Sequence, residues 1–153
     1  MSNFRKYAGY YDLLYRDKGY AAEVDYIDNL VLRYGPGSRN ILELGSGTGR
    51  HALLLADKGY SLHGVDLSDD MVRIARERQR DSAAGNGAEI SFNQGDIRNY
   101  RADSTFDVVI ALFHVVCYQT TNEDIISTFR TAAAHLEEGG LFIFDCWYGP
   151  AVL

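Results

Sequence analysis

An apolar run that leads into three alternating glycines is the feature that most restricts how this chain folds. The run from Ile41 to Leu44 has the length of a buried strand, and the next residues, Gly45 to Gly49, read Gly-Ser-Gly-Thr-Gly. Alternate glycines let a backbone turn sharply and approach a ligand, because no Cβ atom stands in the way. The leucines after Arg50 predict a short helix. This order of strand, turn and helix is typical of a nucleotide-binding α/β fold.

The other apolar segments continue the alternation of strands and helices. Four more strands are expected, at Ser61 to Asp66, Glu89 to Asn93, Phe106 to Phe113 and Leu141 to Phe144. Helices are expected over residues 4–34 with a break near Gly19, after a cap at Ser68, and from Asn122 to Gly139, the last with a core face of Ile125, Ile126, Phe129, Ala133 and Leu136. Short loops between these elements predict a doubly wound α/β fold, in which a mainly parallel sheet has helices on both faces. Such sheets bind ligands at the carboxyl ends of their strands.

Length and composition indicate one globular unit. The chain has 153 residues, 46% of them hydrophobic, and we expect residues 1–34 to form a helical cap on a ligand-binding core of residues 35–153. The net charge of -6 argues against a nucleic-acid partner. With no signal peptide and no apolar run of about 18 residues, a cytoplasmic protein without a membrane partner is expected. Cys117, Cys146 and the histidines lack the spacing of a metal site.

Residues beside the glycines separate the cofactors that such a loop can bind. A dinucleotide fingerprint would have its third glycine where this chain has Arg50, and a phosphate-binding P-loop would need Gly-Lys-Ser or Gly-Lys-Thr. Glu43 would repel a pyrophosphate but would suit a ligand that carries ammonium and sulfonium charges. An NAD-dependent oxidoreductase is therefore disfavoured. The alternative for Glu43 is a solvated charge at a strand end.

Two aspartates follow later strands. Asp66 ends the second strand, where a carboxylate can accept hydrogen bonds from both hydroxyls of a ribose. Asp96 follows the third strand and could accept from an adenine amino group, with Leu67, Met71 and Ile97 against the faces of the ring. Each aspartate alone could merely cap the next turn or helix, but together at one edge of a parallel sheet they favour an adenosine-containing cofactor.

The segments Ile41 to Gly49, Gly64 to Ser68 and Gly95 to Ile97 together resemble the class I S-adenosylmethionine-dependent methyltransferases, over roughly Ser38 to Phe144. The resemblance implies a Rossmann-like methyltransferase fold and S-adenosylmethionine as the cofactor. The residues that it implies for cofactor binding are Glu43, Gly45, Ser46, Gly47, Thr48, Gly49, Asp66, Leu67, Met71, Gly95, Asp96, Ile97, Leu112 and Phe113.

The N-terminal segment is similar to that of a smaller group, the N-methyltransferases that dimethylate nucleotide-linked amino sugars. In that group, tyrosines at the positions of Tyr11 and Tyr20 close the methionine end of the cofactor. The group has small polar residues and a histidine where this chain has His114, Val115 and Tyr118. We expect methyl transfer to a small molecule, such as the amine of an amino sugar, with His114 or Tyr118 orienting the acceptor. A core histidine is the alternative for His114.

The segment after the fifth strand bears on whether the chain contains every strand of the expected methyltransferase fold. Class I methyltransferases usually continue with two further strands, whereas this sequence stops at Leu153. The strand from Leu141 to Phe144 then becomes an exposed apolar edge. We expect either a C-terminally truncated core or an edge covered by a partner, such as a second copy in a homodimer. A non-catalytic cofactor-binding module or fragment is therefore an alternative to an active enzyme.

Overall fold

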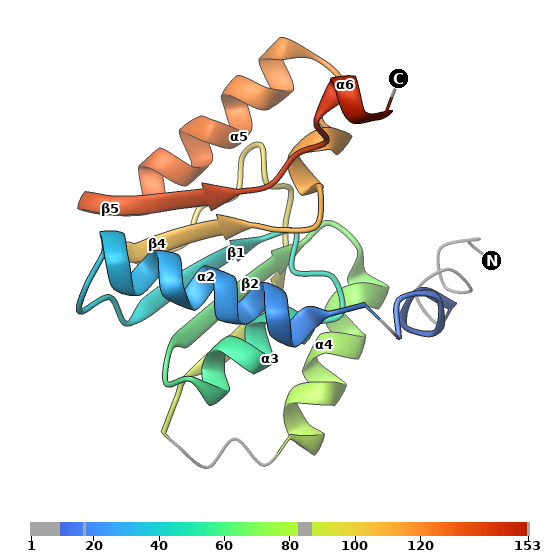
Figure 1. Ribbon diagram of the computed structural model, residues 1–153, viewed down its shortest axis with the longest axis vertical. Coiled ribbons are helices and arrows are strands. Elements are labelled where there is room, and N and C mark those ends of the chain that lie inside the picture. The colour runs from blue at the N-terminus through green and yellow to red at the C-terminus, as the bar shows by residue number, and fades with distance from the viewer. Residues whose placement is uncertain (1–9, 17, 83–86, 153) are drawn as a thin grey trace.

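A five-stranded parallel sheet forms the centre of the protein (Figure 1). The computed structural model describes residues 10–16, 18–82 and 87–152. The strands are β1 (Asn40–Leu44), β2 (Ser61–Asp66), β3 (Ile90–Gln94), β4 (Phe106–Ala111) and β5 (Leu136–Phe144). Their order in the sheet is β3-β2-β1-β4-β5, and all neighbouring pairs are parallel. The expected α/β class is confirmed.

Helices cover both faces of this sheet. They are α2 (Tyr20–Tyr34), α3 (Arg50–Asp57), α4 (Asp69–Asp81) and α5 (Asn122–His135), with a 3₁₀ turn η1 (Val115–Tyr118) and a short α6 (Gly149–Val152). α2, α3 and α4 pack on the face that carries Ile41 and Val108, and α5 packs on the face that carries Leu42 and Val109 (Figure 1). Neighbouring residues of one strand point to opposite faces, and β1 is buried on both faces from Ile41 to Leu44.

The strand order reverses beside β1, and this fixes where a ligand can bind. β2 and β3 lie on one side of β1, and the chain then crosses to β4 and β5 on the other side. The loops after β1 and β4 therefore separate at the carboxyl end of the sheet and leave a crevice between them. At the same end α4 begins with Ser68, whose hydroxyl accepts a hydrogen bond from the Met71 backbone N–H at 3.4 Å.

The buried face of α5 differs from the expected one. Its buried residues are Thr128, Thr131, Ala132 and His135, whereas Ile126 and Phe129 are exposed. The polar residues tolerate burial because they are hydrogen-bonded: the His135 ring lies 2.7 Å from the Thr131 carbonyl oxygen, and its Nε2 accepts from the Ala102 N–H. Phe129 packs instead against Phe142 and Phe144 on the outer strand β5.

Several expected boundaries also move. β5 begins at Leu136 instead of Leu141, so Gly139 and Gly140 lie inside the strand. α5 ends at His135 instead of Gly139, because Leu136 is already extended and pairs with Phe106. β3 begins at Ile90, and β4 ends at Ala111 because Phe113 and His114 have positive φ angles. The expected helical stretch before residue 10 lies outside the described residues. Within the part that is described, no helix is long and apolar enough to cross a membrane.

Candidate cofactor-binding site

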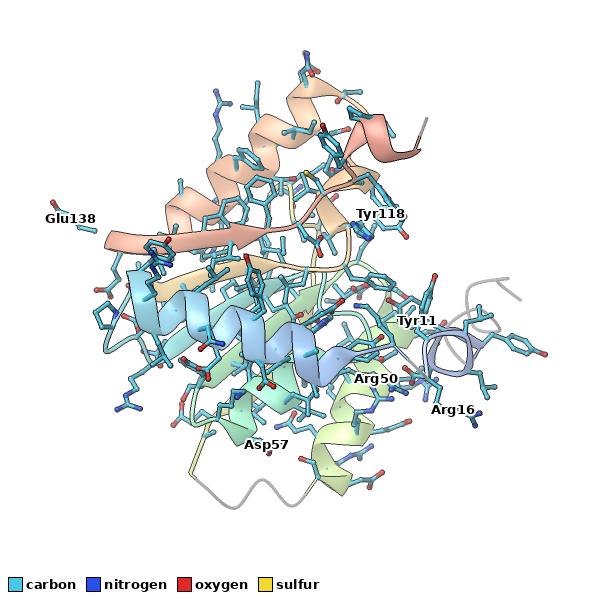
Figure 2. The ribbon with its side chains drawn as sticks, in the orientation of Figure 1. Tyr11, Arg16, Arg50, Asp57, Tyr118 and Glu138 are labelled. Carbon is cyan, nitrogen blue, oxygen red and sulfur yellow. The ribbon has the colours of Figure 1, made fainter. Side chains whose placement is uncertain are left out.

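A cavity of about 430 Å³ lies at the carboxyl end of the sheet. Tyr11, Arg50 and Tyr118, which line it, lie on the side toward which the strand arrows point (Figure 2). The residues predicted from the sequence that line the cavity are Tyr11, Tyr20, Gly45, Ser46, Gly47, Thr48, Asp66, Met71, Leu112, Phe113, His114 and Tyr118. The structure thus brings the glycine-rich loop, the strand-end aspartate and the N-terminal tyrosines together around one space.

The three glycines of the loop have different surroundings. All have positive φ angles: 74° at Gly45, 53° at Gly47 and 77° at Gly49. A Cβ atom on Gly45 would come within 2.6 Å of both Val115 methyl groups, and one on Gly49 would come within 2.8 Å of the Phe92 ring. A Cβ atom on Gly47 would meet no atom within 4 Å. Gly45 and Gly49 are therefore needed for packing, whereas Gly47 presents bare backbone to the cavity.

Asp66 holds the loop and still has acceptor capacity to offer. Its carboxylate accepts hydrogen bonds from the N–H groups of Gly47, at 2.8 Å, and Ser68, at 2.9 Å. Each oxygen has a second lone pair, so the group can accept two further hydrogen bonds from a ligand diol. Burial raises the pKa of Asp66, and the two N–H donors oppose this rise.

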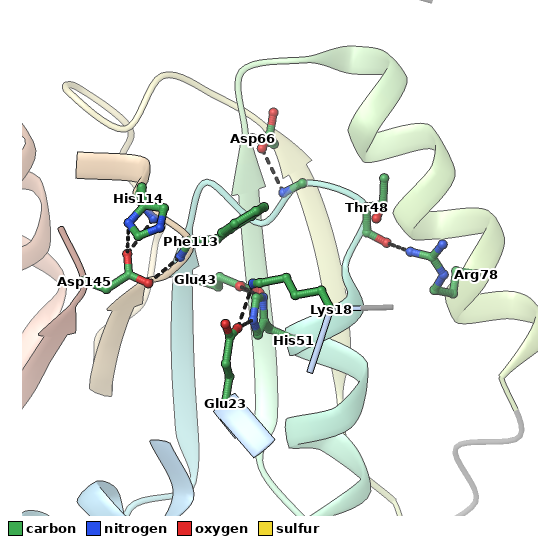
Figure 3. A network of polar contacts seen from close by, with 11 residues as sticks. Lys18, Glu23, Glu43, Thr48, His51, Asp66, Arg78, Phe113, His114 and Asp145 are labelled. Carbon is green, nitrogen blue, oxygen red and sulfur yellow. Dashed lines mark hydrogen bonds and ion pairs between the residues drawn. The ribbon is translucent and has the colours of Figure 1, made fainter. Parts of the chain in front are cut away.

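Glu43 lies buried beside the loop, with only 1% of its surface exposed (Figure 3). Its Oε1 atom lies 3.8 Å from His51 Nδ1, and its Oε2 atom has no hydrogen-bond partner among the described residues. Burial, and then the negative charge of Asp66, raises the pKa of Glu43 to about 8. A carboxyl group with an unsatisfied oxygen favours a cation nearby, and the notion of a solvated strand-end charge is wrong.

A network of opposite charges surrounds Glu43 on the side of α2. Glu23 Oε2 lies 2.7 Å from Lys18 Nζ and 2.7 Å from His51 Nε2 (Figure 3). The Lys18 ammonium also lies over the Phe113 ring, 3.7 Å from its centroid, and 4.5 Å from that of Tyr20. This wall of the cavity thus already stabilises a positive charge with aromatic faces and a carboxylate.

The N-terminal segment is fastened to the glycine-rich loop by Asp12. Its carboxylate accepts from Thr48 Oγ1 at 2.9 Å, Arg50 Nε at 3.1 Å and Arg78 Nη2 at 2.5 Å. Burial acts to raise the pKa of Asp12, but the hydrogen bonds from Arg78 and Thr48 and the two guanidinium charges outweigh it and lower the pKa. The neighbouring Tyr11 ring lies 6.3 Å from that of Phe113 across the cavity wall.

Replacing Asp12 with alanine is expected to release this segment. Charge-assisted hydrogen bonds of this kind contribute about 1.5 kcal/mol or more, so the open state should gain roughly tenfold in population. Trypsin cleavage after the exposed Arg16 (Figure 2) should then accelerate by a similar factor, as followed by mass spectrometry of the released peptide. Asp25→Ala, which removes an exposed carboxylate paired with Lys58, is the control. Equal cleavage rates in the two variants would contradict the role of Asp12.

Six predicted cofactor residues do not line the cavity. Besides Glu43 and Gly49, they are Leu67, Gly95, Asp96 and Ile97. Both carboxylate oxygens of Asp96 accept from Arg98, which also bonds Asp124, and Ile97 packs in the core under β4. The adenine contact expected of Asp96 stays a prediction. In this structure the Arg98 guanidinium donates hydrogen bonds to both oxygens of that carboxylate. Leu67 is exposed, and Gly95 packs under the Tyr100 ring.

Seven further residues line the cavity without having been predicted: Tyr15, Arg50, His51, Ser68, Val115, Cys117 and Trp147. Arg50 was interpreted from the sequence only as the residue that replaces the third glycine of a dinucleotide-binding fingerprint. Trp147 follows β5, which pairs with β4. Its place just after a strand, at the carboxyl end of the sheet, is the signal that could have predicted its position at the cavity. Its ring stacks on His114, with 4.1 Å between centroids and 18° between planes.

The strand end that carries His114 has a strained backbone. Phe113 and His114 have φ angles of 65° and 62°, and such left-handed conformations cost non-glycine residues about 1 to 2 kcal/mol each. Asp145, directly after β5, offsets this cost because its two oxygens accept from the N–H groups of Phe113, at 2.8 Å, and His114, at 2.5 Å. The turn is thus held by a carboxylate from the neighbouring strand (Figure 3).

Comparison with known proteins identifies relatives of this arrangement. The model of a family described as "Methyltransferase domain" matches residues 41–140. A dTDP-3-amino-3,4,6-trideoxy-alpha-D-glucopyranose N,N-dimethyltransferase of Streptomyces venezuelae is 34% identical over 146 residues, which are 94% of this chain and 58% of that protein.

Two solved structures are also similar over most of this chain. The Streptomyces venezuelae protein DesVI has a TM-score of 0.81 at 34% identity, with 96% of this chain and 60% of that chain covered. An amino pentose methyltransferase of Micromonospora echinaspora with bound S-adenosylmethionine has a TM-score of 0.80 at 26% identity, with 92% and 57% covered. The chain thus spans less than two thirds of the length of these relatives.

Proposed function

Because this chain belongs to the class I S-adenosylmethionine-dependent methyltransferases, we propose that it transfers a methyl group to a small molecule and that the acceptor is the amine of an amino sugar. The names of the similar proteins support this acceptor, since one is an N,N-dimethyltransferase of a dTDP-linked amino sugar and another is an amino pentose methyltransferase. The N-terminal tyrosines that line the cavity are consistent with this group.

The observation that carries the proposal is the half-buried Asp66 carboxylate, which binds the open backbone of Gly47, together with the buried Glu43 carboxyl group beside the same loop. Asp66 offers acceptor lone pairs to a ribose diol, and Gly47 leaves room for a ligand against the loop. Among the described residues, Glu43 Oε2 and Ser46 Oγ have no hydrogen-bond partner, and Ser46 lines the cavity. These groups fit a nucleoside that carries positive charge, because a cation beside Glu43 favours the ionised form of its carboxyl group. The fit therefore favours S-adenosylmethionine over a dinucleotide.

Methyl transfer depends more on the alignment of cofactor and acceptor than on acid or base catalysis. S-adenosylmethionine supplies a methyl group bound to a sulfonium. The sulfur is a good leaving group, so the transfer needs no acid. The loop from Gly45 to Thr48 and Asp66 hold the cofactor, and Glu43 favours its positive charge. Tyr11, Tyr15 and Phe113 pack together over the cavity and exclude water. Alignment of two reactants in such a space accounts for a large part of an enzymatic rate.

Replacing Asp66 with alanine tests the cofactor site. Loss of a buried hydrogen-bond partner costs about 1 to 3 kcal/mol, so the dissociation constant for S-adenosylhomocysteine should rise roughly 5- to 150-fold by calorimetry. Asp25→Ala is the matched control, and NAD is titrated in parallel. Tight binding of NAD by the unaltered chain, or unchanged affinity in the Asp66 variant, would refute this site assignment. Cofactor binding without transfer to any amine would identify a non-catalytic module.

A further inference from the structure

Two residues after β5, Asp145 and Trp147, fix the position of His114. Its backbone N–H donates to Asp145 Oδ1, and its ring stacks on Trp147. Ring atom Nδ1 is buried, lies 3.7 Å from Asp145 Oδ1, and has no hydrogen-bond partner among the described residues. With Nδ1 turned to Asp145, Nε2 is the nitrogen left for a ligand in the cavity that His114 lines.

The other ionisable groups near this ring make contacts of their own or point to solvent. Cys117 Sγ accepts a hydrogen bond from the Trp147 N–H at 3.3 Å. Tyr118 lines the same cavity with 76% of its surface exposed. The Lys18 ammonium lies over the Phe113 ring and is bound by Glu23. Asp145 is thus the acidic group that faces the imidazole, with its Oδ1 atom 3.7 Å from Nδ1 (Figure 3).

We propose that His114 accepts the proton which the acceptor amine loses on methylation, and that Asp145 and Trp147 are positioning residues that hold its ring for this task. The inference rests on the proposed function. The lone pair of the amine nitrogen forms the new N–C bond, and the electron pair of the broken C–S bond stays on sulfur. As the N–C bond forms, the nitrogen gives up one proton, which His114 Nε2 takes and later passes to solvent. Histidine suits this exchange because it titrates near neutral pH.

The single tryptophan of the chain provides a direct readout. Trp147 is the only tryptophan in the sequence, so its emission reports the ring stacked on it. A protonated imidazole quenches a stacked indole more strongly than a neutral one, so emission should fall when acidification adds a proton to His114. His114→Gln should abolish this transition. Asp145→Asn should lose at least about half of its amplitude, because the turn is no longer held by a charged acceptor. Asp25→Asn should match the unaltered chain, and a full transition in His114→Gln would overturn the proposal.

Methyl transfer separates this inference from the function on which it rests. The assay uses labelled S-adenosylmethionine and a nucleotide-linked sugar with a primary amine. Removing a general base lowers kcat by about 10² or more, so His114→Gln should lose roughly 100-fold in kcat near neutral pH with an unchanged KM for the cofactor. It should also lose the pH dependence of the rate, whereas an unchanged rate and profile would overturn the inference. An unaltered chain that binds S-adenosylhomocysteine but methylates no amine would refute the proposed function alone, and the fluorescence comparison would still decide the position and protonation of His114.

Discussion

Replacing Glu43 with glutamine is expected to stabilise the ligand-free protein at pH 8 and to remove most of the pH dependence of its stability. Burial, and then the Asp66 charge, raises the pKa of Glu43 to about 8, whereas an unfolded glutamate titrates near 4.3. Between these values the folded state holds a proton that the unfolded state has lost. The contribution is therefore complete below about pH 4 and is lost as the pH rises through about 8.

The size of this effect follows from the distance between the two pKa values. Each unit corresponds to about 1.4 kcal/mol, so the free energy of unfolding should fall by on the order of 3 to 5 kcal/mol across this range in the unaltered chain. Urea unfolding at several pH values measures it. Glu138→Gln, an exposed residue of β5 (Figure 2), is the matched control and should keep the full dependence. Parallel profiles for Glu43→Gln and the unaltered chain would contradict the prediction.

Ligand binding should reverse the protonation of Glu43. A cation at this wall favours the charged carboxylate, so S-adenosylhomocysteine, which carries an ammonium group, should release up to about one proton at pH 7. Calorimetry in two buffers of different ionisation enthalpy counts this proton. The glutamine variant should release none and should bind more weakly, because its neutral amide cannot supply the charge. Equal proton release in both proteins would place the titrating group elsewhere.

Alanine at Gly45 and alanine at Gly47 are expected to damage the protein in different ways. At Gly45 the new methyl group would lie within 2.6 Å of both Val115 methyl groups at a φ of 74°. Strain of about 1 to 2 kcal/mol and overpacking of about 1 to 3 kcal/mol add up to a loss of roughly 2 to 5 kcal/mol in the free energy of unfolding. Urea unfolding should show this loss whether or not a ligand is present.

At Gly47 the effect should appear mainly in binding. The conformational cost is about 1 to 2 kcal/mol, but no atom lies within 4 Å of the added methyl group. That methyl group would stand between the backbone and a bound cofactor, so affinity for S-adenosylhomocysteine should fall at least about tenfold. Gly37→Ala, also at positive φ with open surroundings but between α2 and β1, controls for the backbone cost. Equal affinities in these two variants would show that Gly47 does not face the ligand.

Segments whose pattern reflects burial alone could be predicted from the sequence. β1 is a mainly apolar run and β2 carries Leu62 and Val65, and turn residues follow both strands, so their carboxyl ends could be placed from the sequence. Asp66 was placed correctly at the cavity because a residue that ends a parallel strand has a fixed position relative to the glycine-rich loop.

The remaining features depend on partners that are distant in sequence. His135 became a core residue only because the Ala102 N–H bonds its ring, and periodicity counts a histidine as polar. The contact of Asp145 with the turn at Phe113 requires the register of β5 against β4, and no local pattern encodes that register.

The reversal of strand order beside β1 has a consequence for how such a protein diversifies. The residues that we propose for cofactor binding follow β1 and β2, whereas His114 and Asp145 follow β4 and β5 on the other side of the reversal. Mutations that alter the turn after β4 or the segment after β5 can therefore change the acceptor while the cofactor half is inherited unchanged. Proteins descended from such a sheet can therefore change their acceptor while they keep the same cofactor-binding residues.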